Sequence, residues 1–347
     1  MSEAVREALA GVIDGRTLDP DEARAAMGAV MDGEATPSQL AALLVALRMR
    51  GETVDELTGF AAAMRERVTR VDAPADVVDT CGTGGDGSGT FNISTAAALV
   101  VAAAGVPVAK HGNRAVTSQA GSADVLDALG VRIDHDAASA GEALRSHGFA
   151  FLFAPNFHPA MRHAGPTRRE IGVRTAFNLL GPLTNPAGAR RQIVGVGDPV
   201  AAPKLAEVLH RLGVERAFVV HGSGLDELPL DGSGVLYHAS PDEVVRHEID
   251  ARKLGLSGAP TSKLAGGDPA DNARLLEAVF HGESGARRDV VLLNAAAALL
   301  AAGRVEQLEE GLDVAALTID AGQVTELLET LRAERRVAEA AATGVPA

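Results

Sequence analysis

The 347-residue sequence contains very little cysteine and few aromatic residues, and this scarcity excludes several kinds of protein. Its single cysteine, Cys81, rules out a disulfide framework and a cysteine-rich zinc site, and fits a reducing cytosol. One tyrosine, no tryptophan and nine phenylalanines leave few rings on which nucleic-acid bases stack. We therefore expect a cytoplasmic globular protein that depends on neither disulfides nor base stacking.

Long apolar runs and an excess of positive charge are absent too. The longest apolar run, residues 96–104, is far shorter than the roughly 20 residues that a membrane-spanning helix needs. The first residues lack the apolar segment of a signal peptide, so we expect no targeting sequence. A net charge of −14 opposes binding along a nucleic-acid duplex. We expect neither a membrane nor a nucleic acid among the partners.

The first 70 residues carry three strong helix-start signals. Asp19, Thr36 and Thr53 are each followed three positions later by Glu or Gln, and proline directly follows the first two. Apolar residues then recur at helical spacing. Short amphipathic helices must bury their apolar stripes against one another, a later segment or a second copy of the chain.

From about residue 71, expected strands alternate with expected helices. The strands are expected at 76–80, 106–109, 131–133, 149–153, 192–196, 217–221 and 235–238. The helices are expected at 92–104, 122–129, 138–147, 200–212, 270–280, 289–302 and 307–335. This alternation is typical of a mostly parallel central sheet covered by helices. It pauses between 156 and 185, where we expect the chain to cross back to the N-terminal helices, and polar turns are expected from 239 to 269.

The clearest chemical motif is a glycine-rich segment between an expected strand and an expected helix. Residues 82–89 contain five glycines. Hydroxyl side chains accompany them at Ser88, Thr90, Ser94 and Thr95. Converging backbone N–H groups and a helix N-terminus suit a phosphate or pyrophosphate, although the spacing matches neither the dinucleotide fingerprint nor the P-loop. The plainer alternative is a strand-to-helix turn capped by Asn92.

Two further polar segments follow expected strands. Lys110 and Arg114 lie where they can meet phosphate charge, and parallel strands place this segment beside the glycine-rich one. Asp226 and Glu227 follow another strand and offer the oxygen ligands that Mg²⁺ prefers. The plainer alternatives are a solvated basic loop and a turn with solvated acids.

Residues 156–174 are rich in arginine and histidine. The arginines can hold a carboxylate, although a salt-bridged helix surface has the same pattern. The spacing of His158 and His163 does not place them on one helix face, so we expect structural or surface histidines rather than metal ligands. Cys81 has no motif-level histidine partner and the nucleophile-elbow pattern is missing, so nothing predicts a covalent intermediate.

Together these motifs resemble the anthranilate phosphoribosyltransferase family of tryptophan biosynthesis. The resemblance rests on GTGGDGSGTFNIST (82–95), KHGNRAVTS (110–118), the segment 157–186 and GLDE (224–227), in that order. It implies a Mg²⁺-dependent pentosyltransferase that joins the amine of anthranilate to the sugar of phosphoribosyl pyrophosphate (PRPP), releases pyrophosphate and forms no covalent intermediate.

The resemblance also implies the architecture. A small all-helical domain would comprise residues 1–70, with the excursion 157–190 packed on it. A larger α/β domain with a mostly parallel sheet, residues 71–156 and 191–347, would bind PRPP. Family members assemble as homodimers through the helical domains, which implies the same for this chain.

The family's site residues transfer to this chain position by position. The resemblance implies catalytic roles for Arg168, Asn113 and Lys110. It implies anthranilate contacts at Gly82, Asn113 and Arg168, and Mg²⁺ ligands at Ser94, Asp226 and Glu227. The implied PRPP-binding residues are Gly82, Gly85, Asp86, Thr90, Asn92, Ile93, Ser94, Thr95, Lys110, His111, Gly112, Asn113, Arg114, Ala115, Val116, Thr117, Ser118 and Ser122.

Three positions depart from the family pattern. Ala115 and Thr117 stand where serine is common, and Gln119 where lysine is common. Thr117 keeps the hydroxyl that Ala115 loses, and Gln119 removes a charge beside the phosphate loop. We expect weaker PRPP binding and an unchanged reaction.

Two other functions fit parts of the pattern. A pyrimidine nucleoside phosphorylase has a related architecture, a glycine-rich loop and a Lys-His-Gly segment, but Asn113, Arg114 and the GLDE segment favour the transferase. A non-catalytic, nucleic-acid-binding relative of the same fold requires a basic face and lost motif residues, which the net charge of −14 opposes.

Overall fold

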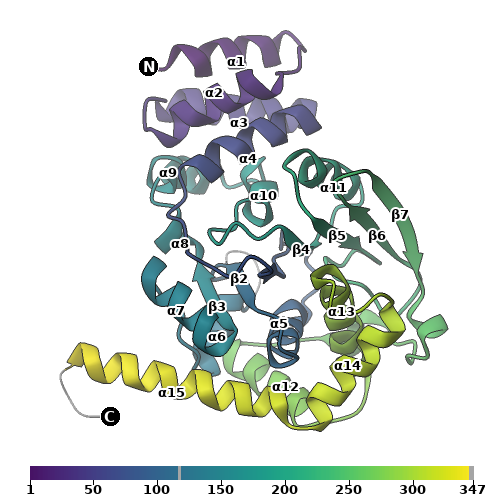
Figure 1. Ribbon diagram of the computed structural model, residues 1–347. Coiled ribbons are helices and arrows are strands. Elements are labelled where there is room, and N and C mark those ends of the chain that lie inside the picture. Colours follow the sequence, from purple (N-terminus) through teal and green to yellow (C-terminus); the bar gives the residue numbers. More distant parts are fainter. Residues whose placement is uncertain (116–118, 344–347) are drawn as a thin grey trace.

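The computed structural model describes residues 1–115 and 119–343, except for the side chains of 342 and 343. Its centre is a seven-stranded sheet in the order β3-β2-β1-β4-β5-β6-β7 (Figure 1). The strands are β1 (Val78–Asp79), β2 (Val108–Gly112), β3 (Phe149–Phe153), β4 (Arg191–Gly195), β5 (Arg216–His221), β6 (Gly234–Ala239) and β7 (Val244–Ile249). The pairs among β1 to β5 are parallel, whereas β6 is antiparallel to β5 and β7. The predicted fold class is confirmed.

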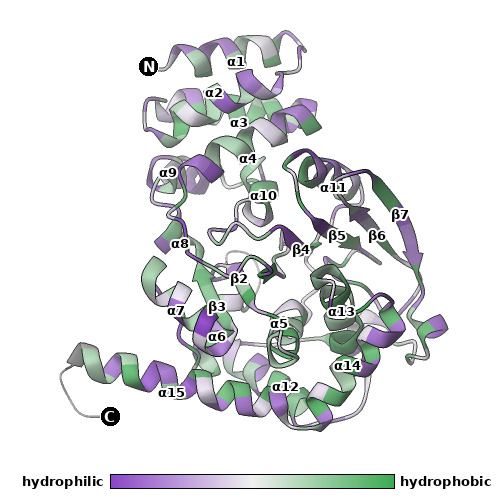
Figure 2. Cartoon of the chain, viewed as in Figure 1, coloured by the Kyte–Doolittle hydropathy of each residue, from purple (hydrophilic) through white to green (hydrophobic). Residues whose placement is uncertain are grey.

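Helices cover both faces of this sheet because successive side chains of its strands point to opposite sides. Ile193 and Phe218 pack on one side, against α5 (Ile93–Ala103) and α13 (Ala286–Ala302), which Figure 2 shows as largely hydrophobic. The same layer contains α6 (Ser122–Ala128), α12 (Pro269–Phe280), α14 (Leu308–Asp320) and α15 (Gln323–Thr343). Val194 and Val219 face the other side, where α11 (Ala201–Arg211) packs, and α7 (Ala137–His147) packs on β3.

Four helices form the N-terminal layer: α1 (Glu3–Ile13), α2 (Pro20–Met31), α3 (Pro37–Arg50) and α4 (Val54–Glu66). The predicted capping boxes are present at Asp19, Thr36 and Thr53. The start of α1 carries no such box, and the Ser2 hydroxyl accepts a hydrogen bond from Val5 N instead. Helices α2 and α4 pack closely at Gly59, where a Cβ atom would lie 2.3 Å from Pro20 O.

The chain returns to this layer between β3 and β4. It forms α8 (Ala154–Phe157), α9 (Met161–Ile171), α10 (Phe177–Leu180) and the short 3₁₀ helix η1 (Gly181–Leu183). Helix α9 packs on α2 and α3, and α10 packs on α4, which also contacts α11. The buried Arg65 guanidinium of α4 donates to Leu183 O at 2.6 Å, and burial lowers the pKa of Arg65 to about 10. The helical layer and one face of the sheet therefore share a continuous apolar core.

Three expected elements are wrong. Residues 131–133 form no strand: Val131 is buried, and Arg132 pairs with Asp134 at 3.0 Å instead of joining the sheet beside β3. Strand β7 lies within the segment expected to contain only turns. Three consecutive residues of this edge strand, Arg246, His247 and Glu248, are polar and exposed, so it lacks the pattern of a buried strand. The expected long helix 307–335 is two helices, α14 and α15, separated at Gly322, which has a φ of +76°.

None of the described helices combines the length and the apolarity needed to cross a membrane.

Candidate active site

The loops that carry the predicted site residues follow β1, β2 and β5, and therefore lie at the carboxyl edge of the parallel strands. The helices after β1 and β4, α5 and α11, cover opposite faces of the sheet. Strand order thus reverses between β1 and β4, which is the position where open α/β sheets form ligand-binding crevices. At this point Thr83 N donates a hydrogen bond to Gly195 O at 2.8 Å.

The loop after β1 needs its glycines for two separate reasons. Four of them have positive φ values between 61° and 74°: Gly84, Gly85, Gly87 and Gly89. Residues with a Cβ atom rarely adopt such values. At Gly82 the reason is space, because a Cβ atom would lie 2.8 Å from Asp226 Oδ2. The loop is therefore more than an ordinary strand-to-helix turn.

One acid of this loop, Asp86, meets two acids of the segment after β5. Oxygen atoms of Asp86, Asp226 and Glu227 lie within 4.8 Å of one another. Asp226 Oδ2 accepts a hydrogen bond from Gly84 N at 3.0 Å, but among the described residues neither Glu227 Oε2 nor Asp86 Oδ2 has a partner. Burial raises the pKa of Asp226, and burial with the charge of Asp226 raises that of Glu227 well above its usual range.

This donor set fits Mg²⁺. The cation prefers carboxylate and hydroxyl oxygens, and it would remove the cost of burying acids without partners. Ser94, a predicted ligand, lines the same small cavity as Asp226 and Glu227. Asp86, predicted as a PRPP contact only, joins the cluster because the glycine loop is held to Asp226, in the segment after β5.

The Lys110 ammonium lies beneath the loop rather than in solvent, and the residue is only 2 % exposed. Its Nζ donates to Thr80 O at 2.9 Å and lies 3.5 Å from Ser94 Oγ. Burial lowers the pKa of Lys110, and the nearby acids, among them Asp79 and Glu227, oppose this shift. Lys110 therefore places a positive charge close to the acid cluster.

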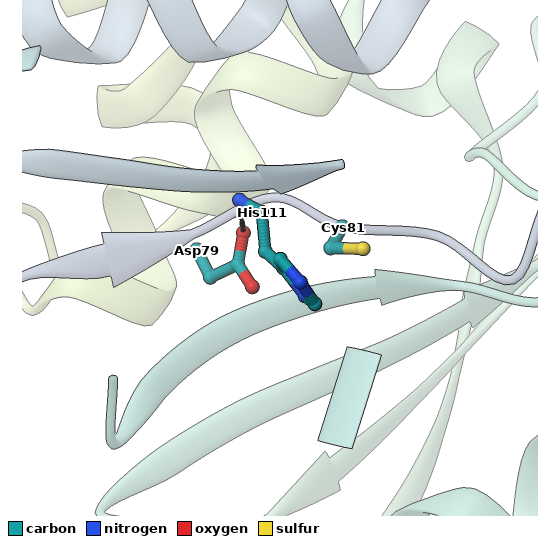
Figure 3. Close-up of side chains that lie close together, drawn as sticks. All are labelled: Asp79, Cys81 and His111. Atoms are coloured by element: carbon teal, nitrogen blue, oxygen red, sulfur yellow. Dashed lines mark hydrogen bonds between the residues drawn. The ribbon is translucent and has the colours of Figure 1, made fainter. Parts of the chain in front are cut away.

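Figure 3 shows the His111 ring between the Asp79 carboxylate and the Cys81 thiol. Asp79 Oδ1 accepts a hydrogen bond from His111 N at 3.1 Å, and burial raises the pKa of Asp79 to about 6. Burial also raises the pKa of the Cys81 thiol. The His111 ring bonds through Nδ1 to Gly181 O and through Nε2 to His158 Nε2, both at 3.2 Å. Because both ring nitrogens are engaged, His111 ties β2 to the helical excursion rather than facing a ligand.

The loop after β2 is held to the start of α6. The Arg114 guanidinium bonds to Asp124 at 2.8 Å and to Asp127 at 3.2 Å, and the bond to Asp124 is the main cause of a raised pKa of Arg114. Ala115, which lacks the family's hydroxyl, donates its backbone N–H to Asp124 Oδ2 at 2.8 Å. Gln119 is exposed. The predicted residues Val116, Thr117 and Ser118 lie outside the described part of the chain.

Neighbouring predicted residues of this loop contact each other. Ser122 Oγ donates to Asn113 O at 3.4 Å, and Asn113 Oδ1 accepts from Arg114 N at 2.8 Å. Gly112 is required by the same contact, because a Cβ atom there would lie 2.3 Å from Ser122 Oγ.

The predicted residues at the start of α5 have different surroundings. Asn92 does not cap α5; its Nδ2 instead donates to Ala120 O at 3.2 Å. Ile93 is fully buried in the core, so only its backbone is available to a ligand. Thr95 Oγ1 is buried and has no described partner, and Thr90 Oγ1 lies 3.1 Å from Ser88 Oγ.

Two arginines of the helical excursion have different surroundings, and one of them reaches the glycine loop. Arg168, in the last turn of α9, places its guanidinium carbon 4.8 Å from the centre of the Phe177 ring, and burial lowers the pKa of Arg168. Arg174 Nη1 donates to Gly84 O at 2.8 Å. Arg174 belongs to the arginine-rich segment but was not among the predicted site residues, since sequence alone does not show which arginine of a cluster reaches the loop.

Comparison with known proteins identifies the family to which this chain belongs. Residues 74–325 match the α/β domain of a glycosyl transferase family and residues 6–68 its helical bundle domain. An anthranilate phosphoribosyltransferase of Pelotomaculum thermopropionicum is 55% identical over 329 residues, which cover 94% of this chain and 95% of that protein. The chain belongs to the anthranilate phosphoribosyltransferase family. It is therefore a glycosyltransferase enzyme, as predicted.

Solved structures of anthranilate phosphoribosyltransferases have the same fold. The crystal structure of the enzyme from Thermus thermophilus matches with a TM-score of 0.90 and 46% identity, covering 96% of this chain and all of that one. The enzyme from Saccharomyces cerevisiae in complex with PRPP and Mg matches with a TM-score of 0.87 and 27% identity, covering 97% and 99% of the two chains.

The buried His111–His158 pair predicts a specific pH dependence of stability. Burial lowers the pKa of His158 to about 4 and that of His111 to about 3. Between the usual histidine pKa of about 6.5 and these values, the unfolded chain binds protons that the folded chain does not, so stability falls as the pH falls. His158→Gln removes one of these protons. The free energy of unfolding should therefore change less steeply with pH, by about 1.4 kcal/mol per pH unit. Urea unfolding from pH 7 to pH 4.5 measures it, with the exposed His281→Gln as control; equal slopes in wild type and His158→Gln contradict the prediction.

Proposed function

We propose that this chain transfers the phosphoribosyl group of PRPP to the amine of anthranilate, giving N-(5-phosphoribosyl)anthranilate and pyrophosphate. The observation that carries the proposal is the meeting of a glycine-rich loop with three acids, two of them lacking a partner for a buried oxygen, at the switch point of the sheet. A pyrophosphate group accompanied by a divalent cation matches both halves of that arrangement. The relatives' names agree with it.

Ser94, Asp226 and Glu227 would hold Mg²⁺, with Asp86 close to it. When bound, the cation neutralises negative charge on the departing pyrophosphate. Backbone N–H groups of the glycine loop and the N-terminus of α5 bind the phosphates. Lys110 contributes from beneath the glycine loop. Its buried ammonium stays hydrogen-bonded to Thr80 O and raises the local positive potential.

The reaction needs alignment more than a base. The amine of anthranilate is uncharged at pH 7, so its lone pair attacks the anomeric carbon while the bond to pyrophosphate breaks, and the amine then loses a proton. We assign Arg168 to the anthranilate carboxylate, which aims the amine. Holding two reactants in attack geometry contributes up to roughly 7–11 kcal/mol. Asn113 is assigned to the anthranilate side of the same pocket.

The division into a helical domain (1–70, with 157–190) and an α/β domain (71–156 and 191–347) stays a prediction, and we propose that the two parts close over the substrates. Arg174 supports this, because it joins the helical excursion to the glycine loop. Closure would exclude water, which otherwise hydrolyses the activated sugar. A cytoplasmic location also remains a prediction, and rests on the single cysteine.

Loss of anthranilate fluorescence tests the proposed reaction. We expect the signal to decay only when purified protein, PRPP and Mg²⁺ are all present, because each supplies a required part of the pocket or the reactants. Decay without PRPP, or none with all three, contradicts the proposal. In the second case nucleosides with phosphate would be assayed, since phosphorolysis is the reaction of the alternative phosphorylase.

Arg168→Ala should raise the KM for anthranilate about tenfold or more, because a charge-assisted bond to the carboxylate is lost. The KM for PRPP should remain nearly unchanged. Steady-state kinetics with each substrate varied in turn measures both values, and the adjacent exposed Arg169→Ala is the matched control. An equal rise in both KM values would refute the role assigned to Arg168.

We further propose that the chain forms a homodimer through the helical layer. Ile13 of α1 and Val45 and Met49 of α3 are 68%, 38% and 84% exposed. α1 and α3 pack on each other, so one contact surface can cover these apolar side chains.

Met49→Glu should convert the dimer to a monomer, because a buried, unpaired carboxylate opposes association. Light scattering after size exclusion measures the mass, with Val337→Glu as the control, because Val337 is an exposed apolar residue of α15. A wild-type mass of one chain, or a variant that stays dimeric, counts against this surface.

A further inference from the structure

A buried asparagine outside the predicted site bonds directly to a predicted PRPP residue. Asn272, in the first turns of α12, is only 2% exposed. Its Nδ2 donates to Asn92 Oδ1 at 2.9 Å, and its Oδ1 accepts from Gly267 N at 2.7 Å. Both ends of the amide are therefore used inside the protein.

These bonds form a directional chain. It begins at a backbone group that can only donate, Gly267 N–H, and ends at one that can only accept, Ala120 C=O. Between them stand the amides of Asn272 and Asn92. Only one orientation of each amide satisfies every bond, because flipping either one sets two donors or two acceptors against each other. This series of hydrogen bonds therefore fixes the orientation of the Asn92 amide: Oδ1 faces Asn272 and Nδ2 faces Ala120 O.

The segment before α12 holds the glycine loop by its backbone. Phe91 N donates to Leu264 O and Gly266 N donates to Gly89 O, both at 2.9 Å. Thr90 and Ala265 form an antiparallel bridge between these bonds. Packing here is close, since a Cβ atom at Gly266 would lie 2.6 Å from Asn272 Oδ1.

We infer that Asn272 is a positioning residue for PRPP binding. It touches no substrate; it orients the Asn92 amide and, through Ala120, ties the loop after β1 to the loop after β2. The inference rests on the proposed function, in which these two loops bind PRPP. Its distinct content is that α12, on the far side of the loops from the helical layer, sets their relative position.

Two substitutions separate orientation from space filling. Asn272→Ala removes both bonds. Asn272→Asp keeps the size of the side chain and the acceptor for Gly267 N, but turns a second oxygen toward Asn92 Oδ1. If Asn272 acts by orienting Asn92, both variants should raise the KM for PRPP about three- to tenfold, the effect of one lost hydrogen bond, with a smaller change in kcat. An Asn272→Asp variant that behaves like wild type would overturn the inference.

A matched control and a double substitution exclude general loosening. Asp268 caps the same helix by accepting from Asp271 N at 2.8 Å, so Asp268→Ala weakens the start of α12 and leaves the Asn92 bond in place. It should leave the KM for PRPP unchanged. In an Asn92→Ala background, Asn272→Ala should add no further rise in that KM. Additive effects, or a control as impaired as Asn272→Ala, overturn the inference.

Amide hydrogen exchange tests the inference without turnover. In substrate-free protein, the amides of residues 89–92 and 119–121 should exchange faster in Asn272→Ala than in wild type or Asp268→Ala. Unchanged exchange at both segments overturns the inference even if the enzyme is active. A wild type without activity overturns the proposed function, while the exchange result still decides whether Asn272 holds the two loops.

Discussion

Two adjacent acids, the half-buried Asp226 and the buried Glu227, impose the constraint around which this end of the sheet is built. A carboxylate away from water is costly unless charge or hydrogen bonds compensate it. Gly84 N and the Lys110 ammonium supply part of that compensation. The oxygens left without a described partner, on Glu227 and Asp86, lie where the proposed cation would bind.

The same constraint explains two glycines that lie far apart in the sequence. Gly195, at the end of β4, cannot carry a side chain, because a Cβ atom would lie 1.6 Å from Asp226 O. At Gly82 the obstacle is Asp226 Oδ2. The backbones of the glycine loop and β4 can therefore approach the segment after β5 closely. The site forms where these three segments converge, and Arg174 of the helical excursion also contacts the glycine loop.

Local signals predicted much of this architecture, and long-range contacts account for most of what was missed. The capping boxes at Thr36 and Thr53 are read from four consecutive residues, so those helix starts could be predicted. Strand β7 has polar, exposed positions, and pairing with β6, rather than its own pattern, makes it a strand. Conversely, Val131 is apolar enough for a strand, but its N–H donates to Leu126 O at 2.9 Å instead of to a strand.

The site shows the same division. Glycine spacing and adjacent acids indicated where phosphate and metal binding should lie, but not that Lys110 points under the loop or that His111 bonds to His158. The role of Asn272 could not be predicted for the same reason, since 180 positions separate it from Asn92. Residues whose roles depend on partners so distant in sequence require the folded chain.

In the proposed function, the acid pair makes PRPP binding depend on Mg²⁺. Calorimetric titration of PRPP into wild type and into Asp226→Asn/Glu227→Gln, each with and without Mg²⁺, tests it most directly. We expect Mg²⁺ to tighten PRPP binding to the wild type and to have little effect on the double variant. A variant that keeps the full Mg²⁺ dependence would show that Asp226 and Glu227 do not bind the cation.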